Sequence, residues 1–288
     1  MTTKPIVVGT DGSTESLRAV EWAAREAKLH QAPLRIVSAA ELLPRMAAPG
    51  SAYNVEAVAS TIRASQDDAL AVAARAAHAM AHDLLIDTDT LEGPPAIAVT
   101  EASAGAHLLV VGSRGSGAFS AMLLGSVSRY AAVHASCPVV VVREETMATH
   151  RQVIVGIRDP HDCAAAVEFA FTEAALRKAS LLAVHAWQSP RAPVEPYPAW
   201  DNRFPEAEAV MQLEELLRDW REKYPEVAAS QDAVHGHPGR VLAGLSARAD
   251  LVVLGRHHRA GHHVPGPARI VHAVLSHAHG PIAIVPSD

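Results

Sequence analysis

Three glycines and a serine between positions 112 and 126 have the spacing of an anion-binding loop. Gly112 ends an apolar run, Gly115 follows after two residues, and Gly125 and Ser126 come nine residues later. Glycine lets the backbone approach a ligand closely, and successive N–H groups can then surround an anion. A helix that begins near Ser126 would add unpaired N–H groups and the positive end of its dipole. These residues therefore predict a cradle for phosphate groups.

The loop needs a strand before it and a helix after it, and the flanking sequence has both patterns. Residues 108–111 form a continuous apolar run, which is typical of a buried strand. After Ser126, the residues Val127, Tyr130 and Ala131 recur at helical spacing. Asp11 follows another apolar run near the N-terminus; an Asp-Gly pair is also a common turn.

The rest of the first half alternates between strand and helix patterns. We expect strands at 5–9, 34–40, 84–90 and 108–111 and from 138, and helices from 14, over 55–82, from 95 and from 126. Ser13 has the side chain of an N-cap, and Ile97 is expected on the apolar face of its helix. The alternation predicts an α/β fold with a doubly wound, five-stranded parallel sheet. Ligands of such sheets bind beyond the carboxyl ends of the strands, where Asp11, Ala39 and Gly112 fall.

The second half of the chain repeats the first. A shift of 147 positions aligns residues 6–9 with 153–156, and a shift of 143 aligns 108–112 with 251–255. A repeat of this length indicates tandem domains rather than a solenoid. We therefore expect two domains, residues 1–146 and 147–288 of the 288-residue chain.

The motifs of the first half resemble the nucleotide signature of the universal stress protein family, in its ATP-binding branch. The resemblance rests on the pattern Gly-x2-Gly-x9-Gly-Ser and on the segments 6–13, 124–128 and 137–142. It implies two tandem domains of the universal stress protein fold, which is similar to that of nucleotide α-hydrolases. It also implies a nucleotide-dependent regulatory module in stress adaptation, acting as a homodimer.

The same resemblance implies a set of ATP-binding residues. Asp11 would face the nucleoside end or a phosphate-bound Mg²⁺, and the backbone of Ala39 would meet the adenine ring. Arg114 either reaches phosphate oxygens or is a solvated surface arginine. The full set is Gly9, Thr10, Asp11, Ala39, Gly112, Ser113, Arg114, Gly115, Ser116, Gly117, Gly125, Ser126 and Val127.

No catalytic motif accompanies this set. The sequence lacks the pattern Gly-x4-Gly-Lys-Ser/Thr and a Gly-x-Ser-x-Gly elbow, and the loop contains nothing that resembles a general base. We therefore expect no catalytic residues and at most weak ATPase activity. Two alternatives stay open, namely a slow nucleotide hydrolase and a nucleotide-free scaffold with a histidine-rich second domain that responds to metal or pH.

The second half departs from the binding pattern. Arg158 stands where Asp11 does and His258 where Gly115 does, whereas Gly255 is kept. A side chain at the second glycine occupies the space where the backbone should approach phosphate. We therefore expect ATP to bind tightly in the first half only, unless the second half holds a nucleotide in another pose.

The chain has 17 histidines, and the altered loop contains a cluster of them: His257, His258, His262 and His263. The cluster could bind a transition metal, become cationic under acid stress, or form a solvated loop without specific contacts. Adjacent histidine pairs rarely chelate well without a third fixed ligand, so we predict no metal ligands.

Composition argues against several other classes of protein. The net charge is −6 and no basic cluster is present, which disfavours binding to nucleic acid or a membrane surface. The two cysteines, Cys137 and Cys163, form no disulfide framework. No apolar run approaches the roughly 20 residues of a membrane-spanning helix, and no signal peptide is evident. We expect a cytoplasmic protein whose partners are ATP, a second copy of itself and an unidentified protein.

Overall fold

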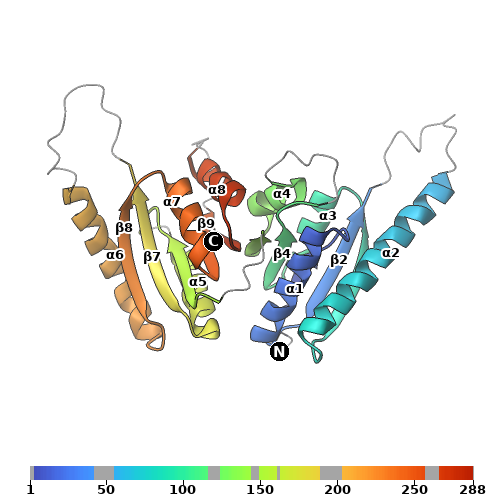
Figure 1. Ribbon diagram of the computed structural model, residues 1–288, viewed down its shortest axis with the longest axis horizontal. Coiled ribbons are helices and arrows are strands. Elements are labelled where there is room, and N and C mark those ends of the chain that lie inside the picture. Colours follow the sequence, from blue (N-terminus) through green and yellow to red (C-terminus); the bar gives the residue numbers. More distant parts are fainter. Residues whose placement is uncertain are drawn as a thin grey trace, which may run out of the picture. The chain divides into compact units, whose positions relative to one another are not determined.

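The computed structural model describes residues 3–41, 55–115, 124–143, 149–160, 163–188, 203–256 and 266–287 (Figure 1). The chain divides into two compact units, Met1–Glu145 and Thr146–Asp288, which we call unit 1 and unit 2. Ser116, Gly117 and the four clustered histidines lie outside the described residues.

Unit 1 contains a parallel sheet with the strand order β3-β2-β1-β4-β5. Its strands are β1 (Ile6–Gly9), β2 (Leu34–Ala40), β3 (Ile86–Glu92), β4 (Leu108–Gly112) and β5 (Val139–Val142). Its helices are α1 (Thr14–Leu29), α2 (Val55–Met80), α3 (Pro95–Ala102) and α4 (Ser126–His134). Helix α1 packs against α2 and helix α3 against α4, and right-handed crossovers put the two pairs on opposite faces (Figure 1). The expected doubly wound α/β fold is confirmed.

Small and branched apolar side chains fill the core of unit 1. Ile6 and Leu108 in the central strands are fully buried, because helices cover both faces of the sheet. Helix α1 turns Val20, Ala24 and Ala27 toward the sheet, and all three are fully buried. Alanine lets the helix lie close to the strands, which explains how a chain with 4% aromatic residues packs a core.

The start of α1 agrees with the sequence, whereas the apolar face of α3 does not. Ser13 is the N-cap of α1, and its side chain accepts a hydrogen bond from the backbone N–H of Ser16. Ile97 was expected on the buried face of α3 but is 39% exposed, and Val99 is buried instead. The helix has only eight residues, too short a stretch for its apolar pattern to fix the buried face.

The third strand also lies further along the chain than expected. It was predicted at 84–90 and spans Ile86–Glu92. As an edge strand of the unit it has mostly exposed or half-buried side chains, so its apolar pattern is weak. Its register with β2 is supported by a contact of 2.5 Å between Arg35 Nη2 and Asp89 Oδ2.

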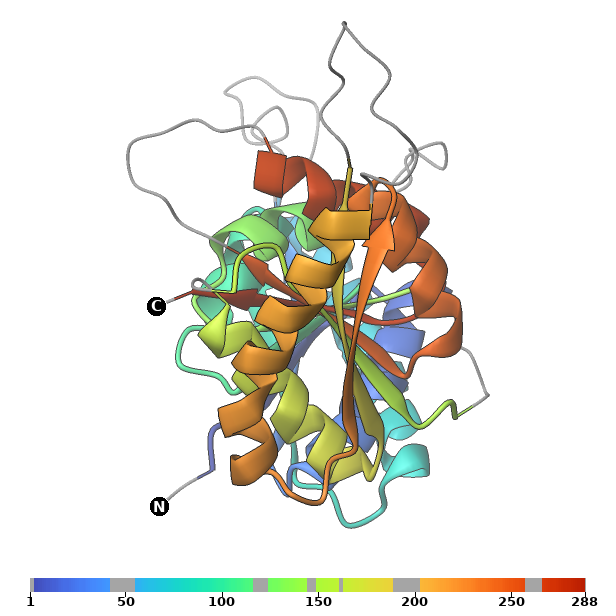
Figure 2. The same cartoon turned by 90° about the vertical axis from the view of Figure 1, so that its left-hand side faces the viewer.

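Unit 2 repeats the same plan, with the strand order β10-β9-β6-β7-β8. Its strands are β6 (Gln152–Gly156), β7 (Ser180–Trp187), β8 (Ala229–His235), β9 (Leu251–Arg256) and β10 (Ile282–Pro286). Its helices are α5 (Ala164–Arg177), α6 (Arg203–Lys223), α7 (Pro238–Leu245) and α8 (Gly266–His277), with a 3₁₀ turn at Ser246–Arg248. Helix α6 runs along β7 and β8 (Figure 2).

Aromatic side chains join α5 to α6 in unit 2. The ring of Phe171 lies 5.9 Å from that of Trp220 and 5.5 Å from that of Tyr224, measured between centroids. Phe171 is fully buried, so Trp220 and Tyr224 act in packing rather than as a platform for stacking a base.

We predict that residues 1–145, expressed alone, fold cooperatively, because unit 1 has its own sheet and core. In this fragment β5 is an edge strand made only of valine, and such edges drive association. Circular dichroism with thermal unfolding and light scattering should therefore report a folded protein that self-associates. A fragment that stays unfolded at every concentration would contradict the division into two independent domains.

Candidate functional site

The carboxyl ends of β1 and β4 bring two of the predicted site residues together. These neighbouring strands lie where the strand order reverses, which is the usual ligand crevice of such sheets. A Cβ atom built on Gly115 would lie 2.4 Å from Oδ2 of Asp11. Both residues are exposed, so the loop after β4 lies against the turn after β1 at an accessible surface.

Hydrogen bonds fix the turn that carries Asp11. Its Oδ1 accepts from the backbone N–H of Ser13 at 3.0 Å and from the Ser13 hydroxyl at 2.5 Å. Its own N–H donates to Oγ of Ser16 at 3.3 Å. The Thr10 hydroxyl lies 3.1 Å from Oγ of Ser16 and accepts from the N–H of Gly12 at 3.2 Å. Glycine suits position 12 because its φ is +78°.

Close packing against α1 requires the first glycine of the loop. A Cβ atom on Gly112 would lie 2.9 Å from the carbonyl oxygen of Glu15 in the first turn of α1. The next residue, Ser113, is buried, and its N–H donates to the carbonyl of Val142 at 2.8 Å. Gly112 thus sets the position of the loop, and Arg114 and Gly115 follow it at the exposed surface.

Helix α4 begins beside the same loop. The N–H of Gly125 donates to the carbonyl of Ser113 at 2.8 Å, and the Ser128 hydroxyl donates to that carbonyl at 3.3 Å. The N-cap is Gly125, so the N-cap has no side chain to accept from the N–H groups of the first turn. Ser126 is the first helical residue and is exposed. This helix start is therefore suited to an anion.

The remaining described residues of the predicted set lie at or near the ends of β1 and β2 and in the first turn of α4. Gly9 packs against the core, since a Cβ there would lie 3.1 Å from Cγ1 of Val99. Ala39 is half-buried near the end of β2, two residues beyond Val37, whose carbonyl accepts from the N–H of Thr10. Val127 is half-buried in the first turn of α4.

Sequence reasoning missed the part played by Ser16. Its buried hydroxyl receives the N–H of Asp11 and donates to the carbonyl of Ser13 at 2.9 Å. The repeat could have drawn attention to Ser16, because a shift of 147 positions aligns it with Cys163. A hydroxyl is thus replaced by a thiol in the half whose binding motif is degenerate.

The corresponding end of the sheet in unit 2 is apolar. Ile157 replaces Thr10 and Cys163 replaces Ser16, and both are buried. The Cys163 thiol donates to the carbonyl of Pro160 at 3.3 Å, as the Ser16 hydroxyl does to Ser13 in unit 1. A cavity of about 70 Å³ remains at this end of the sheet, bounded by residues that include Ile157, Cys163, Leu242 and Leu254.

Larger side chains also crowd the first strand of unit 2. A Cβ atom on Gly156 would lie 2.9 Å from methyl carbons of both Leu242 and Leu254. The aligned residues in unit 1 are Val99 and Val111, one methylene shorter. In place of Asp11 stands Arg158, which is exposed.

Comparison with known proteins identifies the family. The model of the universal stress protein family matches residues 2–143 and 149–286, so the chain belongs to that family, in two tandem copies. A universal stress protein of Mycolicibacterium smegmatis is 35% identical over 261 residues, covering 89% of this chain and 88% of that protein. One from Mycobacterium tuberculosis is 34% identical over 268 residues, with the same two coverages.

A solved structure has the same fold. The crystal structure of a universal stress protein from Archaeoglobus fulgidus covers 99% of this chain and 97% of its own, with a TM-score of 0.70 and 17% identity. In the described parts of our chain, no helix combines the length and apolar character needed to cross a membrane.

Proposed function

We propose that the protein is an ATP-binding universal stress protein that acts in stress adaptation as a nucleotide-dependent regulatory module. The observation that carries the proposal is the approach of Gly115 to Asp11 beside the start of α4. Because Gly115 has no side chain, the loop can lie against the carboxylate of Asp11, where a Cβ would meet Oδ2 at 2.4 Å. The phosphates would lie over the N–H groups of residues 114 and 115 and of the first turn of α4.

The residues present fit ATP with a divalent cation better than ATP alone. The Asp11 carboxylate would repel a triphosphate, and Mg²⁺ between the two would remove that repulsion. Arg114 is exposed next to Gly115 and can add a positive charge. The backbone of Ala39, near the end of β2, would receive the base.

Binding rather than turnover is the activity that this site supports. Asp11 already accepts two hydrogen bonds from Ser13. The described residues of the loop after β4, 113–115, include neither histidine nor lysine. A general base needs free access to the attacking water. An enzyme is the second candidate, and steady-state phosphate release at an ordinary rate of about 1 per second or faster would favour it.

The first experiment is to identify what the protein carries. Mass spectrometry of the denatured, purified protein should release an adenine nucleotide. Calorimetry with ATP, ADP, AMP and adenosine, with and without Mg²⁺, should give affinities that rise with the number of phosphates. No retained nucleotide, and no rise in unfolding temperature on adding ATP, would instead support a scaffold without nucleotide.

We also propose a cytoplasmic location and a homodimer, with a further protein as the receiver of the signal. The support is the family and the composition given above, and chemical crosslinking with and without ATP tests the homodimer.

A further inference from the structure

Unit 2 contains a cavity at the carboxyl ends of its strands, in the position that the candidate nucleotide site has in unit 1. Its volume is about 70 Å³, and the described residues of its wall all belong to unit 2. Strands β6, β7 and β9 and helices α7 and α8 contribute to this wall. The two helices pack together over one face of the unit 2 sheet (Figure 1). The cavity is therefore a feature of unit 2 itself.

At two positions in this wall, hydrocarbon replaces a buried hydroxyl group of unit 1. A shift of 143 positions aligns Val271 with Ser128, whose buried hydroxyl donates to a loop carbonyl in unit 1. A shift of 147 positions aligns Ile157 with Thr10, whose buried hydroxyl accepts a backbone hydrogen bond. The end of the sheet that is polar in unit 1 is thus apolar in unit 2.

Three further positions in the wall carry a larger aliphatic side chain than in unit 1. Leu242 and Leu254 stand in place of valines, and Ile270 stands in place of Val127. These exchanges all add apolar carbon, yet they do not fill the crevice, since the cavity remains. Together they give the cavity a wall that favours a hydrocarbon ligand, because apolar surface gains free energy by leaving water.

Two polar groups in the wall already have hydrogen-bond partners. The N–H of Ile157 donates to the carbonyl of Val184 at 2.8 Å, and the thiol of Cys163 donates to the carbonyl of Pro160 at 3.3 Å. A buried water needs about two to four polar partners, whereas a cavity lined by leucine and isoleucine stays dry and takes up apolar molecules. Water is therefore a poor occupant of this cavity, and hydrocarbon is a good one.

Arg158 adds a positive charge to the wall. It is exposed, so its guanidinium can stay hydrated while its hydrocarbon stem lies against apolar surface. It stands where unit 1 has Asp11, so the sign of the charge at this position is inverted. A guanidinium binds a carboxylate through two parallel hydrogen bonds. The wall therefore suits a ligand with an apolar chain and an anionic head.

We propose that unit 2 binds a short-chain carboxylic acid, with its hydrocarbon chain in the cavity and its carboxylate on Arg158. The size of the cavity limits the chain. A cavity of about 150 Å³ takes up benzene, so one of about 70 Å³ holds roughly three carbon atoms. Acids close in size to butyrate should therefore fit best. The proposal concerns unit 2 and does not depend on ATP binding in unit 1.

Ligand-observed NMR on the full-length protein, with the straight-chain acids from acetate to hexanoate, tests the proposal. The affinity should rise about fourfold with each CH₂ group from acetate to butyrate, because each group leaves water for the cavity. It should then level off, since longer chains extend beyond the cavity. n-Propylamine has the same propyl chain with the opposite charge, so it should bind roughly tenfold or more weakly than butyrate. Saturating ATP should change none of these affinities.

Two substitutions in the wall act on different parts of the ligand. Arg158→Gln removes the charge and should weaken butyrate binding roughly tenfold or more, while the gain with chain length stays. Ala186→Leu adds an isopropyl group to the wall, about the volume that the chain would take, and should abolish the gain with chain length. Thermal unfolding without ligand shows that each variant folds.

Matched controls come from the amino end of β9, away from the cavity. Ala247 and Arg248 are exposed in the 3₁₀ turn before this strand, so Ala247→Leu and Arg248→Gln should leave butyrate binding unchanged. The proposal is overturned if affinity does not depend on chain length, if Arg158→Gln binds butyrate like the wild type, or if butyrate competes with ATP. A protein that binds butyrate as described but no ATP would contradict the proposed function of unit 1 and support this site in unit 2.

Discussion

Replacing Gly115 by valine should weaken ATP binding about a hundredfold, or roughly 2.8 kcal/mol, since each tenfold is 1.4 kcal/mol. The new Cβ would lie 2.4 Å from Oδ2 of Asp11, so either the carboxylate or the loop must move. In the proposed site Asp11 holds the cation and Gly115 lies against the phosphates, so both positions are needed. The residue is exposed, so the free energy of unfolding should change by less than about 0.5 kcal/mol. Calorimetry and thermal unfolding measure the two effects.

A second glycine provides the matched control. Gly244 lies in α7, and among the described residues no atom is within 4 Å of a Cβ built there. Gly244→Val makes the same chemical change in open space, and it should leave ATP affinity unaltered. If Gly115→Val also bound ATP with wild-type affinity, the phosphate cradle would be the wrong description of this loop.

A double variant distinguishes the two ways in which valine can act. If Gly115→Val acts by displacing the carboxylate, then in an Asp11→Ala background it should have little further effect. If it blocks the phosphates directly, the two losses should add, because the substitutions then remove different interactions. Asp11→Ala alone should also abolish any gain in affinity from Mg²⁺.

Sequence patterns predicted the elements whose side chains are buried and failed where the burial is partial. Strand β2 has the expected bounds, Leu34–Ala40, and the N-cap of α1 is Ser13 as expected. The edge strand β3 and the outward-facing Ile97 were misplaced, because their half-exposed positions carry little apolar pattern. The bounds and the buried face of such an element are decided by the strand or helix that packs against it. A local sequence pattern holds no information about that neighbour.

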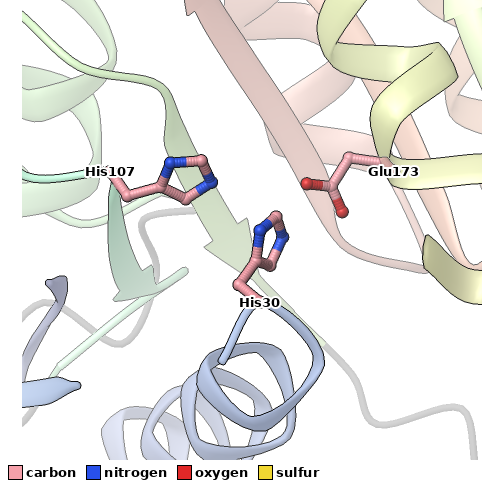
Figure 3. Close-up of side chains that lie close together, drawn as sticks. All are labelled: His30, His107 and Glu173. Atoms are coloured by element: carbon pink, nitrogen blue, oxygen red, sulfur yellow. The ribbon is translucent and has the colours of Figure 1, made fainter. Parts of the chain in front are cut away.

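The candidate site shows the same division between local and distant information. Motifs predicted Asp11 and Gly115 separately, but their contact arises from the pairing of β1 with β4. The pairing of His30 with His107 is a second case, because their rings lie 4.6 Å apart between centroids although the two residues are far apart in the sequence (Figure 3).

The two halves of the chain should bind nucleotide unequally, with one ATP held tightly per chain in unit 1. In unit 2 the hydroxyl of Ser16 is replaced by the thiol of Cys163, and Ile157 takes the place of Thr10. In unit 1 the buried hydroxyls of Thr10 and Ser16 hold the turn that carries Asp11 through hydrogen bonds, and Ile157 has no hydroxyl that could accept one.

Steric and charge differences act in the same direction. Methyl carbons of Leu242 and Leu254 lie 2.9 Å from a Cβ atom built on Gly156, and the cavity that remains has a volume of only about 70 Å³. Arg158 replaces the carboxylate proposed to hold the cation. Several losses of this kind amount to several kcal/mol, and every 1.4 kcal/mol lowers the affinity tenfold.

Two arginines can oppose this asymmetry, because guanidinium binds phosphate well: Arg269, which aligns with Ser126, and Arg158, which is exposed. Replacing Arg158 by alanine therefore completes the test. Equilibrium dialysis and calorimetry of the full chain should give one ATP for the wild type, for Arg158→Ala and for His258→Ala. Asp11→Ala and Gly115→Val should remove that single tight site. Two sites of similar affinity in the wild type, or a fall from two to one in Arg158→Ala, would show that unit 2 binds ATP through its arginine in a different pose.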